Sequence, residues 1–136
     1  MAVNLKGKQV LYVVNGVDIQ YAWILNYVTS ELGAATLLSF QDAVSMINHS
    51  PDPERVGVVF YLTGPSDFPG MNTVRYLAQL GYRVIVIGQS SEVIYGVWAG
   101  LAGAVAFIPT GHLDCACVKE AIRVAFMTEI ATPVPA

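Results

Sequence analysis

Five short runs of apolar residues recur along the chain, and amphipathic segments separate them. The runs occupy residues 9–14, 35–40, 56–62, 83–87 and 105–108. Each run is short for a helix and rich in β-branched and aromatic residues, a pattern typical of strands covered on both faces. Strands that alternate with helices predict an α/β fold with a doubly wound, five-stranded parallel sheet. The run at 56–62 is the most apolar, so we expect it to be central.

The intervening segments predict helices at residues 18–32, 41–48, 71–80, 91–101 and 113–128. In the first of these helices, Asp18 is the expected N-cap, and Ile19, Trp23, Tyr27 and Val28 share one face. In the last, Val118, Ile122 and Ala125 should face inward, and Lys119, Glu120 and Arg123 outward. Residues 1–128 therefore form one predicted domain, and residues 129–136 a linker stub or frayed tail.

The composition excludes several classes of protein. Of the 136 residues, 54% are hydrophobic and only 12% are charged, which is the opposite of the balance in disordered chains. The formal net charge is -3, and the seven Lys and Arg residues are scattered rather than clustered. Nucleic acids and anionic membrane surfaces are bound through clustered basic side chains. We therefore expect neither direct nucleic-acid binding nor attachment to a membrane.

The cysteine content and the absence of a leader pattern favour a reducing compartment. Cys115 and Cys117 are too few for the disulfide framework of a secreted protein, and their spacing disfavours a bond between them. Residues 93–113 carry no charge, but glycines and Pro109 interrupt this stretch, so it does not read as a membrane span. The expected location is the cytoplasm.

Four short segments resemble sequence motifs of a known domain and occur in the same order. They are PGMN at 69–72, VIVI at 84–87, AGLAGA at 99–104 and FIPTGHL at 107–113. These segments resemble the turn after the third strand, the fourth strand, the end of the fourth helix and the fifth strand of receiver domains in bacterial two-component response regulators. The resemblance spans residues 8–126. It implies a flavodoxin-like (βα)5 fold and a role in phosphorelay signal transduction.

The resemblance also implies a phosphorylation pocket, but the matching positions lack the required groups. In receivers, two acidic residues and an Asp hold Mg²⁺, the Asp accepts the phosphoryl group, and a Ser or Thr and a Lys contact its oxygens. The matching positions are Val14 and Asn15 (or Asn15 and Gly16), Leu62 between Tyr61 and Thr63, Gly88, and Thr110 before Gly111. We therefore interpret the chain as a pseudo-receiver, a non-enzymatic domain without a metal or cofactor.

The predicted fourth helix carries apolar residues on more than one face, and Glu92 is its only charged residue. A helix that covers one side of a sheet needs only a single apolar stripe. Large exposed apolar patches usually mark interaction sites. In receivers this region, with the fifth strand and fifth helix, contacts dimer and output partners. We therefore predict an interaction face at Tyr95, Trp98, Leu101 and Phe107, used for homodimerisation and for an output domain, as in transcription regulation, or a histidine kinase.

Two alternatives stay open at this point. The first is a phospho-accepting receiver in which Asp18 or Asp67, displaced from the usual position, accepts the phosphoryl group. The ordinary roles expected for them are an N-cap for Asp18 and a turn residue for Asp67. The second is a small-molecule-binding module, with a neutral ligand held by the loops at 15–16, 63–64 and 110–111.

Other polar residues are assigned structural roles. His112 is expected to be a solvent-facing turn residue and His49 a surface residue. Ser90 and Ser91 are expected to cap the fourth helix. Cys115 and Cys117 are about 200° apart on a helix, so they cannot share one metal.

Overall fold

The computed structural model describes residues 5–14, 21–34, 36–63, 68–88 and 93–127. Along the chain the elements are β1 (Gln9–Val14), α1 (Ala22–Glu31), β2 (Thr36–Phe40), α2 (Ala43–His49), the 3-10 turn η1 (Pro53–Arg55), β3 (Val56–Thr63), α3 (Phe68–Gln79), β4 (Val84–Gly88), α4 (Val93–Leu101), β5 (Ala106–Pro109), the 3-10 turn η2 (Thr110–His112) and α5 (Cys115–Met127).

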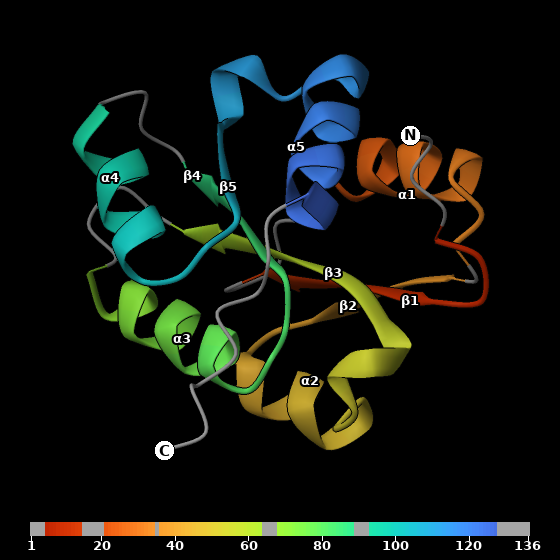
Figure 1. Ribbon diagram of the computed structural model, residues 1–136, viewed down its shortest axis with the longest axis horizontal. Coiled ribbons are helices and arrows are strands. Elements are labelled where there is room, and N and C mark those ends of the chain that lie inside the picture. Colours follow the sequence, from red (N-terminus) through yellow and green to blue (C-terminus); the bar gives the residue numbers. More distant parts are fainter. Residues whose placement is uncertain (1–4, 15–20, 35, 64–67, 89–92, 128–136) are drawn as a thin grey trace.

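The sheet is parallel, with the strand order β2-β1-β3-β4-β5. Helices α1 and α5 lie on one face, and α2, α3 and α4 cover the other (Figure 1). The predicted (βα)5 fold is thus confirmed. Because β2 lies on one side of β1 and β3 on the other, the strand order reverses between β1 and β3. Ligands of open α/β sheets commonly bind beside such a switch point.

Alternate side chains of each strand pack on opposite faces of the sheet. In β1, Tyr12 and Val14 pack toward α1 and α5, whereas Leu11 and Val13 pack toward α2 and α3. Every residue of β3 is buried, as expected of a central strand covered by helices on both sides. Burial on both faces explains why the strands appear in the sequence as continuous apolar runs.

The prediction for the buried face of α5 is confirmed, because Val118, Ile122 and Ala125 are fully buried. Of the four residues expected to share one face of α1, Val28 is buried, Trp23 and Tyr27 are 69% and 55% exposed, and Ile19 lies outside the described residues. The buried residues of α1 are Ile24, Leu25, Val28 and Thr29. The buried stripe is shifted by one residue because Thr29 can enter it. Its hydroxyl donates a hydrogen bond to the Leu25 carbonyl at 2.7 Å, which removes the cost of burial.

Two helices begin at capping aspartates. The side chain of Asp42 accepts a hydrogen bond from the Ser45 backbone N–H at 2.7 Å, so α2 begins after Asp42 rather than at Gln41. The Asp114 carboxylate accepts one from the Cys117 N–H at 2.8 Å, so α5 begins at Cys115. In the described part of the chain, no helix is both long enough and apolar enough to cross a bilayer.

Candidate functional site

The strand register brings four predicted pocket positions to the carboxyl edge of the sheet. Val14 at the end of β1 pairs with Leu62, and Leu62 pairs with Ile87 of β4. Gly88 follows Ile87 and pairs with Pro109, after which Thr110 begins the turn beyond β5. The fifth position, Asn15, lies outside the described residues, as do Asp18, Asp67, Ser90 and Ser91.

The described positions at this edge are mainly apolar. Val14 and Leu62 are 2% and 5% exposed and belong to the core beneath α1 and α5. A buried aliphatic side chain has no oxygen atom to coordinate Mg²⁺ or to accept a phosphoryl group. Among the described residues, no group of three or more His, Cys, Asp or Glu is arranged to hold a metal ion.

Phe107 lies against the end of β4, at the position that the sequence comparison aligned with a Ser or Thr of receivers. A Cβ atom added to Gly88 would be 2.6 Å from two carbon atoms of the Phe107 ring, closer than side chains can approach. The same ring lies beneath α4, since a Cβ at Gly96 would be 3.6 Å from it. Phe107 therefore fills the space between the carboxyl end of β4 and α4.

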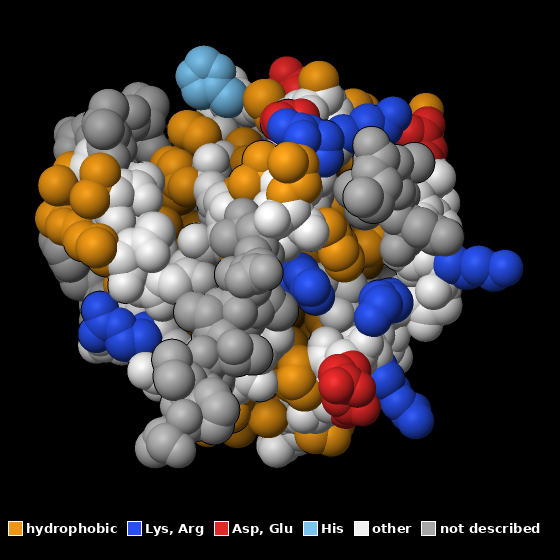
Figure 2. Space-filling model, viewed as in Figure 1, with side chains coloured by type: hydrophobic (Ala, Val, Ile, Leu, Met, Phe, Trp, Pro, Cys, Tyr) orange, Lys and Arg blue, Asp and Glu red, His pale blue; other side chains and the backbone are white. Residues whose placement is uncertain are grey.

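The outer surface of α4 is apolar. Ile94, Val97 and Leu101 are exposed, Leu101 by 73%, and their spacing of three and four residues places them in one stripe, here called the outer α4 stripe. Figure 2 shows hydrophobic side chains gathered over this helix. Beside the stripe, the half-buried rings of Tyr95 and Trp98 meet edge to face, with 5.2 Å between their centroids.

The structure thus separates the four residues of the predicted interaction face. Tyr95 and Trp98 contact each other, Leu101 is on the outer stripe, and Phe107 lies beneath the helix. The face named from the sequence omitted Ile94 and Val97, although their helical spacing from Leu101 was a visible signal.

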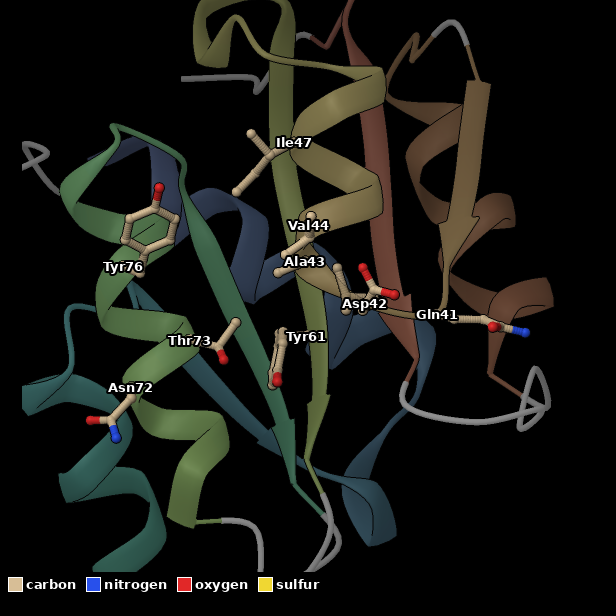
Figure 3. A pocket seen from close by; sticks show the side chains of 10 residues that line it. Gln41, Asp42, Ala43, Val44, Ile47, Tyr61, Asn72, Thr73 and Tyr76 are labelled. Atoms are coloured by element: carbon tan, nitrogen blue, oxygen red, sulfur yellow. The ribbon is translucent and has the colours of Figure 1, made fainter.

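A crevice between α2 and α3 was not predicted from the sequence. Its volume is about 430 Å³, and Val13 of β1 and Tyr61 of β3 contribute to its lining. Asp42 and Val44 line it from the α2 side, and Thr73 and Tyr76 from α3, as Figure 3 shows. The available signal was weak, because these residues come from four elements far apart in the chain.

At the amino end of the sheet, Ser50 and His49 form a structural hydrogen-bond network. The Ser50 hydroxyl donates to Gln9 Oε1 at 3.0 Å and lies 3.0 Å from His49 Nδ1. These contacts join the end of α2 to the start of β1. Tyr82 donates a hydrogen bond to the Ser50 carbonyl at 2.6 Å, which ties this segment to β4.

The turn before α5 and the first turn of α5 contain further titratable groups. His112 is exposed, as predicted. Hydrogen bonding from the Cys117 backbone N–H lowers the pKa of Asp114, and the neighbouring His112 adds to this effect. Burial, reinforced by Asp114, raises the pKa of the Cys117 thiol, which disfavours the reactive thiolate. Cys115 and Cys117 are both free.

Comparison with known proteins places this geometry in a recognised fold. The sequence matches no protein-family model and no curated protein. Among solved structures, the FixJ-N structure is 25% identical, with 91% of this chain and 97% of that chain covered and a TM-score of 0.68. A response regulator receiver protein from Pseudoalteromonas atlantica is 20% identical (88% and 97% covered, TM-score 0.66). A candidate pilus assembly-related protein from Burkholderia pseudomallei is 12% identical (88% and 90% covered, TM-score 0.69). The chain therefore has the fold of response regulator receiver domains.

Proposed function

We propose that the chain is a receiver-like signalling domain that acts by protein–protein contact and does not depend on aspartyl phosphorylation. The packing of Phe107 against Gly88 carries this proposal. The ring takes the space that a phosphoryl-contacting Ser or Thr side chain would need. A signalling context is supported by the similarity to FixJ-N and to the Pseudoalteromonas receiver protein.

The chemistry of the carboxyl edge supports the same proposal. Phosphoryl transfer needs a nucleophilic oxygen and positive charge to neutralise the transferred group. At the acceptor position Leu62 is a buried hydrocarbon, and at the position of the phosphate-contacting Lys, Thr110 has no charge. The domain is accordingly proposed to be non-enzymatic and to need no metal or cofactor.

We propose that the outer α4 stripe (Ile94, Val97 and Leu101), together with Tyr95 and Trp98, forms the contact surface. Three exposed aliphatic side chains on one helix face would be desolvated if a second apolar surface covered them. The proposed partners are a second copy of the chain and an output domain or histidine kinase in the cytoplasm. Residues 129–136 would act as the linker to an output domain, with transcription regulation as one context.

An NMR titration tests the independence from phosphorylation. Amide spectra are recorded with Mg²⁺ and then with beryllofluoride, which mimics a phosphoryl group. We expect no saturable shifts at Asn15, Leu62, Gly88 and Thr110. Saturable shifts there would overturn the proposal. Asp67→Asn and Asp18→Asn would then identify a displaced acceptor, because loss of the shifts in one variant would assign the site.

Sedimentation analysis tests the proposed contact surface. We expect concentration-dependent dimerisation of the wild type, and weaker dimerisation of Leu101→Glu and Trp98→Glu. Val44→Glu is the matched control, because Val44 on α2 is 67% exposed, close to the 73% of Leu101. A monomeric wild type at high concentration, or equal effects of Leu101→Glu and Val44→Glu, would contradict the use of α4 for self-association.

A further inference from the structure

The crevice between α2 and α3 has the position and size of a ligand site. It is lined by Val13 of β1 and Tyr61 of β3, the two strands between which the strand order reverses. Ligands of open α/β sheets usually bind at the carboxyl ends of the strands beside such a switch point, and Val13 and Tyr61 lie within two residues of the ends of their strands. Its volume of about 430 Å³ lies within the range of roughly 300–1,000 Å³ typical of small-molecule pockets.

The charge of the crevice restricts what it can bind. Of the described residues that line it, only Asp42 is charged. One Asp42 oxygen, Oδ1, accepts the Ser45 N–H at 2.7 Å, which orients the carboxylate at the start of α2. The hydrogen bond from Ser45 also holds the pKa of Asp42 below its ordinary value, so the carboxylate is charged at neutral pH. A single carboxylate favours a cationic group and disfavours phosphates and carboxylates.

The remaining lining combines aromatic rings with uncharged polar groups. Tyr76, which is 55% exposed, supplies an accessible ring, whereas Tyr61 is only 7% exposed and contributes a small part of its surface. Val44 and Ile47 supply aliphatic surface, and Thr73 supplies a hydroxyl group. Tyrosine faces attract cations as well as other aromatic rings. Rings and a carboxylate in one crevice therefore fit a molecule with an aromatic ring and an amine.

We propose that the α2–α3 crevice binds a small aromatic amine, with the ammonium group beside Asp42 and the ring against Tyr76. The inference does not rest on the proposed signalling function, because the crevice and the outer α4 stripe share no residue. It also differs in its residues and in its charge preference from a neutral ligand held by the loops at 15–16, 63–64 and 110–111.

Three probes of nearly equal shape test the proposal: tyramine, its neutral analogue tyrosol and the anionic 4-hydroxyphenylacetate. Each is titrated into the full chain while amide NMR shifts are followed. We expect tyramine to give saturable shifts at Val13, Asp42 and Thr73. From the size of exposed charge–charge interactions, tyramine should bind about tenfold more tightly than 4-hydroxyphenylacetate. The difference should shrink in 1 M salt, where the Debye length is about 3 Å.

Matched variants separate binding from folding. Asp42→Asn removes the charge but keeps a good N-cap, so we expect tyramine affinity to fall to that of tyrosol without loss of fold. Thr73→Leu fills the crevice and should abolish binding, whereas Gln79→Leu, on the exposed side of the same helix, should not.

Several results would overturn the proposal. These are equal affinities for tyramine and 4-hydroxyphenylacetate, an unchanged tyramine affinity in Asp42→Asn, or shifts centred away from α2 and α3. Absence of saturable shifts with all three probes would equally overturn it. None of these results would bear on the proposed contact surface at α4, so the two ideas fail separately.

Discussion

The ring of Phe107 lies where any side chain at position 88 would have to project. A Cβ built on Gly88 would meet two ring carbons at 2.6 Å, while the Thr63 hydroxyl oxygen would be 3.6 Å away. The contact joins the end of β4 to β5 and, through Gly96, to α4. Glycine at position 88 and an aromatic residue at position 107 are therefore one structural unit, and restoring a hydroxyl at position 88 requires the ring to move.

Gly88→Ser should destabilise the fold, because the added atoms overlap the Phe107 ring. Overpacking of this kind costs about 1–3 kcal/mol in the free energy of unfolding. Urea denaturation measures the change, and the cost of Gly88→Ser should be smaller in a Phe107→Leu background. Gly96→Ala is the control, since its Cβ would be at an ordinary 3.6 Å from the ring. Equal costs of Gly88→Ser in both backgrounds would mean that the ring is not the obstacle.

Replacing glycine by alanine should have opposite effects on stability at positions 103 and 100. Gly103 follows the end of α4 with φ of +102°, and a Cβ there would lie 2.8 Å from the Ala78 Cβ of α3. Gly103→Ala should therefore destabilise the chain by about 1–2 kcal/mol. Gly100 lies inside α4, and a built Cβ there would have no atom from outside its own helical turn within 4 Å, so Gly100→Ala should stabilise by about 0.5–1 kcal/mol. Thermal unfolding of both variants measures the contrast, and shifts of the same sign would contradict it.

Tyr82 should make the fold sensitive to alkali. Its hydroxyl donates to the Ser50 carbonyl at 2.6 Å, and burial, with a smaller contribution from Asp52, raises its pKa above the ordinary 10.0. The stabilisation is therefore fully present below pH 10 and is lost as the pH rises through the raised pKa of Tyr82.

Tyr82→Phe measures this contribution. At neutral pH the variant should lose about 1 kcal/mol, the usual net worth of a hydrogen bond. Above pH 10 the difference from the wild type should decrease, because a phenolate cannot donate. Tyr76→Phe, at an exposed position of α3, should match the wild type throughout. A constant difference between the wild type and Tyr82→Phe up to pH 12 would show that the hydroxyl is not responsible.

Much of the sheet was predictable, because a strand that is buried on both faces appears in the sequence as a continuous run of apolar residues. The wholly buried β3 appears as the continuous run VGVVFYLT, and the inward face of α5 follows from the spacing of Val118, Ile122 and Ala125. The face of α1 was not predictable from apolar spacing alone. Trp23 and Tyr27 have the right period, but Thr29 takes a place in the core by bonding to the Leu25 carbonyl.

The candidate sites depended on contacts between distant segments, which periodicity does not encode. The sequence could show that position 88 lacks a hydroxyl, but not that the Phe107 ring packs against it. The α2–α3 crevice combines Val13, Asp42, Tyr61 and Thr73, which become neighbours only after the sheet forms. The outer apolar residues of α4 could be identified from the sequence, whereas the position of Phe107 beneath the helix could be seen only in the structure.

The ion pair between α1 and α5 predicts how Glu31 titrates. Lys119 Nζ lies 3.0 Å from Glu31 Oε2. This hydrogen bond, and to a smaller extent one from Tyr27, holds the pKa of Glu31 below its ordinary value of 4.5. Lys119→Met should therefore move the pKa of Glu31 upward. A carboxyl group whose pKa is lowered by folding stabilises the fold at pH values above its ordinary pKa. Any stability difference between wild type and variant should therefore vanish as the pH falls through the lowered pKa of Glu31.

Side-chain carboxyl NMR across an acid titration measures the shift directly. Glu120 is the internal control, because its lowered pKa arises from Arg123 on the same helix and should not change in Lys119→Met. Loss of Lys119 should also raise the pKa of Tyr27 further, since Glu31 raises it and the lysine charge opposes that effect. If the titration of Glu31 is the same in wild type and variant, the two helices are not joined by this pair in solution. If Glu31 and Tyr27 both shift while Glu120 does not, α1 and α5 are in contact at this point.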